Sequence, residues 1–164
     1  MRSKKGFIIT GIILVAVTAG SFSIWLMPQN PQTKFVISNA KEDLDALIEQ
    51  QSTIADSTTE EFNKMISGQI TADNYISIAE ISSSQVNALI IKVIQSEVPK
   101  EWQTSYSSFD DFLRTYNTYL KETIVVANKL KENPQADISE DTTRLGDLLK
   151  QADAILADSN NSRP

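Results

Sequence analysis

The chain has 164 residues, with 15 Lys plus Arg against 21 Asp plus Glu and a formal net charge of −6. It contains neither His nor Cys, which excludes imidazole bases, histidine-bound zinc or haem, thiolate nucleophiles and disulfides. The length allows one modest domain, since domains commonly hold about 100–150 residues. A hydrophobic content of 41% is sufficient for a packed core.

An uncharged run of 22 residues extends from Gly6 to Met27. As a helix this run is roughly 33 Å long, enough to cross a hydrocarbon core of about 30 Å. Residues 1–5 carry three basic side chains, so the positive-inside rule predicts a cytoplasmic tip at 1–5 and an extracytoplasmic remainder. Trp25 falls near the outer end, where an indole suits the membrane–water interface. The sequence therefore predicts a single-pass signal anchor over residues 6–27 in the cell membrane.

A cleaved signal peptide is the alternative interpretation of the same run. Val17-Thr18-Ala19 supplies small residues for cleavage between Ala19 and Gly20, which would release a secreted chain. The apolar run continues past the usual length of such a segment, about 7–15 residues. This excess length favours a retained anchor.

Ala16 and Gly20 form a small-xxx-small pair inside the predicted span. Small residues at this spacing let a second helix approach closely within a membrane. They are the candidate helix-contact positions of the span.

The chain beyond the predicted span has a different charge balance. Residues 28–164 carry 12 basic and 21 acidic residues, a net charge of −9. Such a surface disfavours nucleic acid, whose phosphates require clustered Lys and Arg. It also disfavours a domain lying flat on anionic lipid. We expect residues 28–38 to be a linker and residues 39–158 to be an extracytoplasmic helical bundle.

Turn residues are too sparse in this region for a β-sandwich, because Gly68 and Gly146 are its only glycines. Helical spacing of apolar residues begins after Asn39, which with Glu42 fits a capping box. We expect one helix from Asn39 to Gly68; the alternative is a second, short helix that begins at Thr58. The expected buried positions are Ala40, Leu44, Leu47, Gln51, Ile54, Thr58, Phe62 and Met65.

Two further helices are predicted on either side of Pro99. The first has Thr71 as its N-cap and continues to about Val98, since no turn residue interrupts it. Its expected buried line is Tyr75, Ile78, Ala79, Ser82, Val86, Leu89, Ile90, Val93 and Ile94. The next begins at Pro99, a favoured first-turn residue, and ends near Glu132. Its stripe is Trp102, Tyr106, Phe109, Leu113, Tyr116, Leu120, Ala127 and Leu130.

The last predicted helix begins at the acidic segment Ser139-Glu140-Asp141, which suits the positive end of a helix dipole. Its apolar face is Leu145, Leu148, Leu149, Ala152, Ile155 and Leu156. Residues 159–164 are polar, and we expect them to be a disordered tail. Within this tail Asn160-Asn161-Ser162 is a glycosylation acceptor pattern, which matters only if the domain meets a glycosylation machinery.

Amphipathic helices joined by short connections must alternate in direction. The predicted fold class is therefore all-α: an up-down antiparallel bundle of three to four long helices after an N-terminal transmembrane helix. Heptad-like stripes favour left-handed packing of the coiled-coil type.

The sequence offers little for catalysis. Glu42, Asp45 and Glu49 share one helix face, whereas a glycosidase needs carboxylates on opposite sides of a cleft. No calcium loop, GxGxxG loop or P-loop is present. We predict no enzyme activity, no catalytic residue, no cofactor and no metal.

Two aromatic residues, Phe112 and Tyr119, flank the main stripe of the third predicted helix. Burial in the core is the favoured role, because aromatic side chains contribute large buried areas. The alternative is a patch that contacts a partner or a small ligand.

The segment Gly11–Asn30, which ends in SFSIWLMPQN, resembles the N-termini of small, uncharacterised, single-pass membrane-anchored proteins of ammonia-oxidising archaea. The resemblance covers about the first 30 residues. It implies an archaeal cell-surface location and transfers no functional residue.

Two function classes follow from these observations. The leading hypothesis is a membrane-anchored, non-catalytic helical bundle that acts by protein interaction, as an accessory subunit or an envelope structural element. The alternative is an extracytoplasmic ligand-binding or sensory bundle that works with a membrane partner. Another protein or a second copy of the chain is the expected partner, beside the membrane itself.

Overall fold

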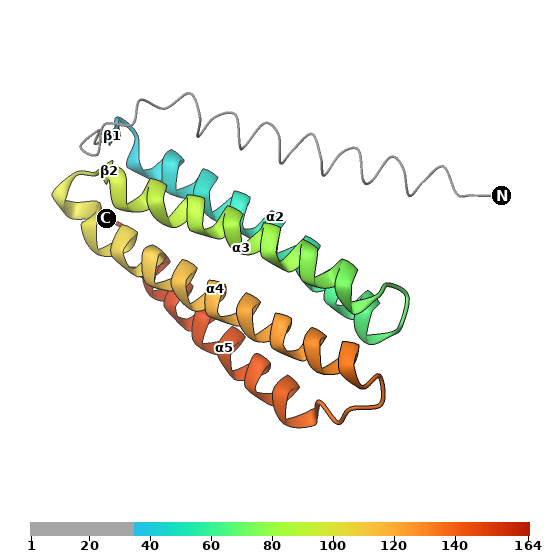
Figure 1. The fold of residues 1–164 in the computed structure, drawn as a ribbon. Helices are drawn as coiled ribbons and strands as arrows, with labels where there is room; N and C mark the ends of the chain where they lie inside the picture. The colour runs from blue at the N-terminus through green and yellow to red at the C-terminus, as the bar shows by residue number, and fades with distance from the viewer. Residues whose placement is uncertain (1–34) are drawn as a thin grey trace. The chain divides into compact units, whose positions relative to one another are not determined.

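The computed structural model describes residues 35–164, which form four long helices (Figure 1). These are α2 (Ala40–Ile66), α3 (Ala72–Gln95), α4 (Gln103–Glu132) and α5 (Ser139–Asn161). Two short strands, β1 (Phe35–Val36) and β2 (Ser96–Glu97), and a 3-10 turn, η1 (Lys100–Trp102), complete the described part. Among these residues no helix has both the length and the apolarity that crossing a bilayer requires.

Several sequence predictions lie outside the described residues. They are the basic tip 1–5, the span 6–27 with Trp25, the cleavage point after Ala19 and the Ala16–Gly20 pair. The segment Gly11–Asn30 that carries the archaeal resemblance is also outside. These remain predictions.

The prediction of an all-α fold is confirmed for residues 35–164. Successive helices run in alternating directions (Figure 1), as short connections demand. Helix α4 packs closely along both α3 and α5, and α2 packs along α3. The four helices thus follow one another in space in the same order as in the chain.

Helix α2 is one continuous helix, so the alternative of a separate helix from Thr58 is wrong. The Asn39 side chain caps it by accepting a hydrogen bond from the Glu42 amide at 3.3 Å, which satisfies one free N–H of the first turn. The helix ends at Ile66, two residues before the predicted Gly68, and Gly68 follows with a φ of 73°, a conformation available to glycine at little cost. The amides of Gly68 and Gln69 bond back to the carbonyls of Met65 and Lys64. This is a Schellman ending, and it turns the chain sharply into α3.

The buried positions agree closely with the predicted stripes. Of the expected positions on α2 only Ile54 is half-buried, and on α3 Ile78 is half-buried. Ile94 is a clear error, because 60% of it is exposed. Val93 is the residue that faces the core, and Ile94 follows it by about 100° around the helix. Helix α3 ends at Gln95, three residues before the predicted end at about Val98, so no later turn covers Ile94.

The predicted linker 28–38 is partly structured at its end. Strand β1 pairs in parallel with β2, with Phe35 opposite Ser96 and Val36 opposite Glu97. The Ile37 amide adds a hydrogen bond to the Glu97 carbonyl at 3.2 Å. The chain therefore enters the bundle beside the connection between α3 and α4. That connection ends in the 3-10 turn η1, in place of the start of the α-helix predicted from Pro99, and α4 begins only at Gln103.

The predicted disordered tail 159–164 is also wrong in part. Helix α5 continues through Asn161, and Ser159 is fully buried. Its hydroxyl donates to the Ser105 carbonyl at 2.8 Å, while the Ser105 hydroxyl donates to the Ser159 carbonyl at 2.7 Å. This reciprocal pair holds the end of α5 against the start of α4. Hydrophobic spacing does not reveal it, because both side chains are small and polar.

Candidate functional site

A groove lies between α2 and α5, with α4 as its floor. We call it the α2–α5 groove; its volume is about 250 Å³. Helix α4 contributes Phe112 and Tyr116 to the floor. The walls come from α2 and α5, and their lining residues are Ile48, Gln51, Ser52, Ala55, Thr59, Leu149, Ala152, Asp153 and Leu156.

Gln51 and Tyr116 are the two polar residues of the groove lining that are buried. Gln51 is only 4% exposed and lines the groove, yet its side-chain amide makes no hydrogen bond to other described residues. The amide is not among the fully enclosed polar groups of the described residues, so it opens onto the groove and can bond to a molecule there.

Asp153 gives the groove its charge. Its carboxylate has no ion-pair partner in the described part of the chain, and none of the lining residues is basic. All 21 acidic residues but only 11 of the 15 basic ones lie within residues 35–164, a net charge of −10. The field of such a domain attracts cations.

Ion pairs and a hydrogen-bonded tyrosine close the bundle at the end where β1 and β2 lie. Arg163 contacts Asp45 across the helix ends at 2.5 Å. The Tyr106 hydroxyl donates to the Ala40 carbonyl at 2.9 Å and approaches the Asp43 carboxylate at 3.1 Å. Together these contacts join the first turns of α2 to α4 and to the end of α5.

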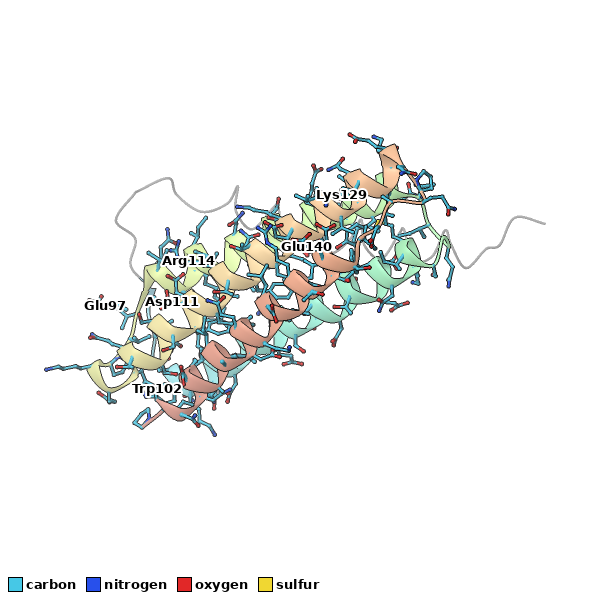
Figure 2. The ribbon with its side chains drawn as sticks, turned by 90° about the horizontal axis from the view of Figure 1, so that it is seen from below. Glu97, Trp102, Asp111, Arg114, Lys129 and Glu140 are labelled. Carbon is cyan, nitrogen blue, oxygen red and sulfur yellow. The ribbon has the colours of Figure 1, made fainter. Side chains whose placement is uncertain are left out.

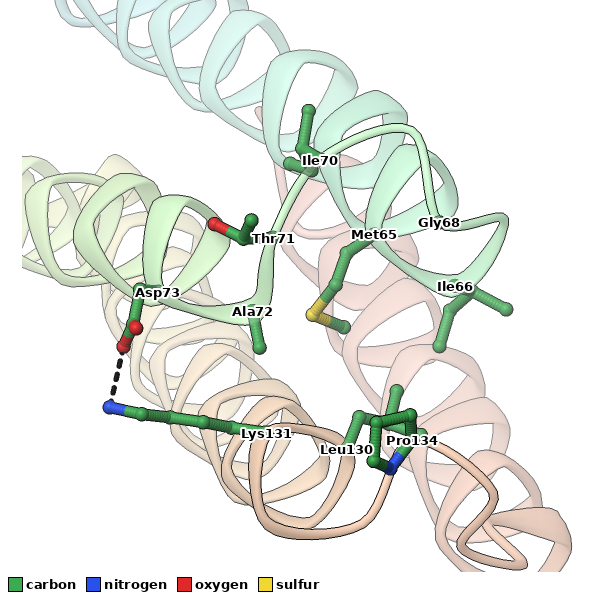
Figure 3. A pocket seen from close by; sticks show the side chains of 10 residues that line it. All are labelled: Met65, Ile66, Gly68, Ile70, Thr71, Ala72, Asp73, Leu130, Lys131 and Pro134. Carbon is green, nitrogen blue, oxygen red and sulfur yellow. Dashed lines mark ion pairs between the residues drawn. The ribbon is translucent and has the colours of Figure 1, made fainter.

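A second hollow, of about 370 Å³, lies at the opposite end of the bundle (Figure 3). The turn between α2 and α3 forms one side, with Met65, Ile66 and Ile70, and Leu130 and Pro134 at the end of α4 form the other. Its two charged groups satisfy each other, because Lys131 Nζ lies 2.6 Å from the Asp73 carboxylate. We call it the end pocket.

Charged side chains surround the bundle (Figure 2), and large apolar side chains interrupt them on α3. Ile91 is 54% exposed and Ile94 60%. Ile81, also exposed, and the half-buried Ala88 lie within about 80° of Ile91 around the helix, and Ile94 lies about 60° further on. We call these four residues the α3 strip. Elsewhere on the described helices large exposed apolar residues are isolated, as Val125 is on α4.

The structure assigns Phe112 and Tyr119 to the core, at 3% and 4% exposure, in agreement with their favoured role. Phe112 has a second position as well, because it lines the α2–α5 groove, whereas Tyr119 does not. The two are therefore not one patch. Asn160 is exposed in the last turn of α5.

All four tyrosines of the chain have a raised pKa, and burial is the main cause in each. The Tyr75 hydroxyl donates to Thr123 at 2.6 Å. The Tyr116 hydroxyl is buried and has no hydrogen-bond partner among residues 35–164. Thr58 lies near enough to oppose the pKa shift of Tyr116 slightly, but its hydroxyl is used by Ile54 and Ser82. These groups resist ionisation, which argues against tyrosinate chemistry.

Within residues 35–164, no group of three acidic side chains is arranged to hold a metal ion. Comparisons of the chain with protein-family models, with curated proteins and with solved structures gave no match. The structural features that bear on function are therefore the α2–α5 groove, the end pocket and the α3 strip.

Proposed function

We propose that this chain is a membrane-anchored helical bundle that acts by contact with a partner protein, as an accessory or structural element of the cell envelope, and not by catalysis. The α3 strip carries the proposal. The anchor and the extracytoplasmic orientation follow from the uncharged run Gly6–Met27 and the basic residues that precede it.

The strip is suited to another helix. Ile81 and Ala88 are seven residues apart, and Ile91 follows Ala88 by three, which is the spacing by which one helix face repeats for packing. Small Ala88 lies between two isoleucines, so a partner helix could lie close to the backbone at that point. Full burial of an exposed isoleucine contributes about 1.5–3 kcal/mol to the free energy of binding. The contribution is smaller here, because each isoleucine is already partly buried in the free bundle.

The exposed isoleucines of the strip do not belong to the core of the described bundle. The opposite side of α3 supplies the core residues Tyr75, Val86 and Val93, and the neighbouring side bonds to α4 through Ser83 and Asn117 at 2.6 Å. Replacing Ile91 and Ile94 should therefore leave the fold intact. This separation makes a test of contact possible without loss of the bundle.

The test is photo-crosslinking in native membranes. A photoreactive residue at position 91 should capture one neighbour in constant proportion, and Ile91→Ser with Ile94→Ser should abolish the co-purification of that neighbour. The matched control is Val125→Ser, because Val125 on α4 is similarly exposed at 46% but lies outside the strip. Equal loss of the neighbour in the control, or no neighbour from position 91, would contradict the proposal.

A further inference from the structure

We propose that the α2–α5 groove binds a small organic cation, namely an amine with an apolar body. This inference concerns a different face from the α3 strip and does not depend on the contact function.

The apolar body is indicated by the floor and walls of the groove. Phe112 and Tyr116 supply aromatic carbon beneath it, and Ile48, Leu149 and Leu156 supply aliphatic walls. Aromatic rings also attract cations through their quadrupole. The volume of about 250 Å³ is below the range of about 300–1,000 Å³ that is typical for drug-sized ligands. The ligand is therefore small.

The positive charge is indicated by the polar groups. Asp153 presents a carboxylate without a basic partner in the part of the chain that the structure describes, and Gln51 presents an amide whose oxygen can accept an N–H bond. In the proposed complex the ammonium group of the ligand lies against the Asp153 carboxylate and donates a hydrogen bond to the Gln51 amide oxygen. An anion would find no basic side chain in the groove and would meet the field of a domain with net charge −10.

The end pocket does not provide this combination. Its carboxylate, Asp73, is already neutralised by Lys131 at 2.6 Å (Figure 3). No aromatic side chain is among its described lining residues. Its apolar surface comes from Met65, Ile66, Ile70, Leu130 and Pro134. It is the larger hollow, but it lacks a free charge to select a ligand.

Three probes of one shape and different charge test the proposal. Calorimetric titration of the full chain in zwitterionic lipid nanodiscs should show saturable binding of benzylamine, which is a cation at neutral pH. Benzyl alcohol and benzoate should bind at least about fivefold more weakly. Empty nanodiscs give the partitioning background. Higher salt should weaken the binding of benzylamine, because the carboxylate is near the surface.

Two variants of one helix locate the site. Asp153→Asn should weaken benzylamine binding about fivefold. Asp158→Asn removes the same charge from α5 but lies outside the groove lining, and its affinity should stay within about twofold of the parent. Both positions are exposed, so neither change should impair folding.

Filling the groove gives an independent check. Ala55→Leu keeps every charge but places extra carbon between α2 and α5, and should abolish binding while helix content by circular dichroism is retained. The proposal is overturned if the three probes bind equally or not at all, or if Asp153→Asn and Asp158→Asn lose affinity equally. The two Asp variants do not depend on repacking of the groove. They therefore decide the proposal even if Ala55→Leu fails to fold.

Discussion

The two seams of this bundle differ in what crosses them. Between α3 and α4, polar side chains bond directly across the helices: Tyr75 to Thr123 at 2.6 Å, and Asn117 to Ser83 and Asn87 at 2.6 and 2.9 Å. Between α2 and α5 the structure shows a groove beside residues 48–59 of α2 and 149–156 of α5, and one ion pair, Asp45–Arg163, at the end. Hydrogen bonds between side chains therefore fix how α3 packs on α4, whereas α2 and α5 leave a groove between them.

The difference shows where stability and binding reside. Helix α4 has both α3 and α5 packed along it, and its buried side chains form the centre of the core. Among the described helices, α2 packs closely on α3 and makes few contacts with α4. A ligand or partner that enters beside α2 disturbs few existing contacts. Four predictions test this contrast, in order of decreasing effect.

Alkaline pH should unfold the bundle, because its four tyrosines are buried on both seams of α4. Burial raises the pKa of Tyr75, Tyr106, Tyr116 and Tyr119, so the folded state favours their neutral forms. Their contribution to stability is complete below the unfolded pKa of about 10 and decreases as pH rises above it. Phenolate absorbance should rise together with the loss of helical circular dichroism. Phenolate formation near pH 10 with helix retained would contradict the burial of these groups.

Truncation of a core leucine should separate the two sides. Leu120 on α4 is fully buried, and Leu120→Ala should lower the free energy of unfolding by about 4 kcal/mol. Ile48 on α2 is half-buried at the groove, so Ile48→Ala should cost only about 1 kcal/mol. Urea denaturation of both variants measures the difference. Equal losses would mean that α2 is packed as tightly as α4.

Removal of single tyrosine hydroxyls should have effects of opposite sign. Tyr75→Phe removes a buried hydrogen bond to Thr123 and should cost about 1 kcal/mol. Tyr116→Phe removes a hydroxyl that has no partner in the described bundle, so stability should be unchanged or rise by about 1 kcal/mol. Thermal melts of the two variants give the comparison. A loss of stability in Tyr116→Phe would show that this hydroxyl is bonded in solution.

The smallest effect is expected where α2 and α5 meet at their ends. Asp45→Asn removes the ion pair with Arg163, and both side chains are partly exposed, so stability should fall by about 0.5 kcal/mol or less. Hydrogen exchange should still become faster in the first turns of α2, since little else holds them to α5. Unchanged exchange there would assign the closure of this end to Tyr106 alone.

Much of the fold could be predicted because helices repeat their burial at a regular spacing. The positions Leu44, Leu47, Phe62 and Met65 on α2 follow that spacing and are all buried. The Asn39 and Thr71 caps could be predicted because each side chain bonds to an amide only three residues further along the chain. Errors occur at the ends. Ile94 follows the spacing but has no neighbouring helix to cover it, and Ser159 breaks the apolar pattern yet is buried.

The candidate sites were far less predictable. The groove depends on how far α2 stands from α5, which is a property of the whole bundle and not of any motif. Gln51 was correctly expected to be buried, but its lack of partners depends on side chains from two other helices. Asp153 resembles every other exposed acid in the sequence. Phe112 was identified as a candidate by its position beside the main stripe, and the groove explains that position.

The connectivity of the bundle has a consequence for how it folds. Each close helix pair joins neighbours in the chain, α2 with α3, α3 with α4 and α4 with α5, so loop closure between them is short and its entropic cost is low. Chains with such local topology fold in microseconds to milliseconds. Helix α4 takes part in two of the three pairs and lies in the middle of the order. We therefore expect the folding nucleus to form around α4, with α2 docking last.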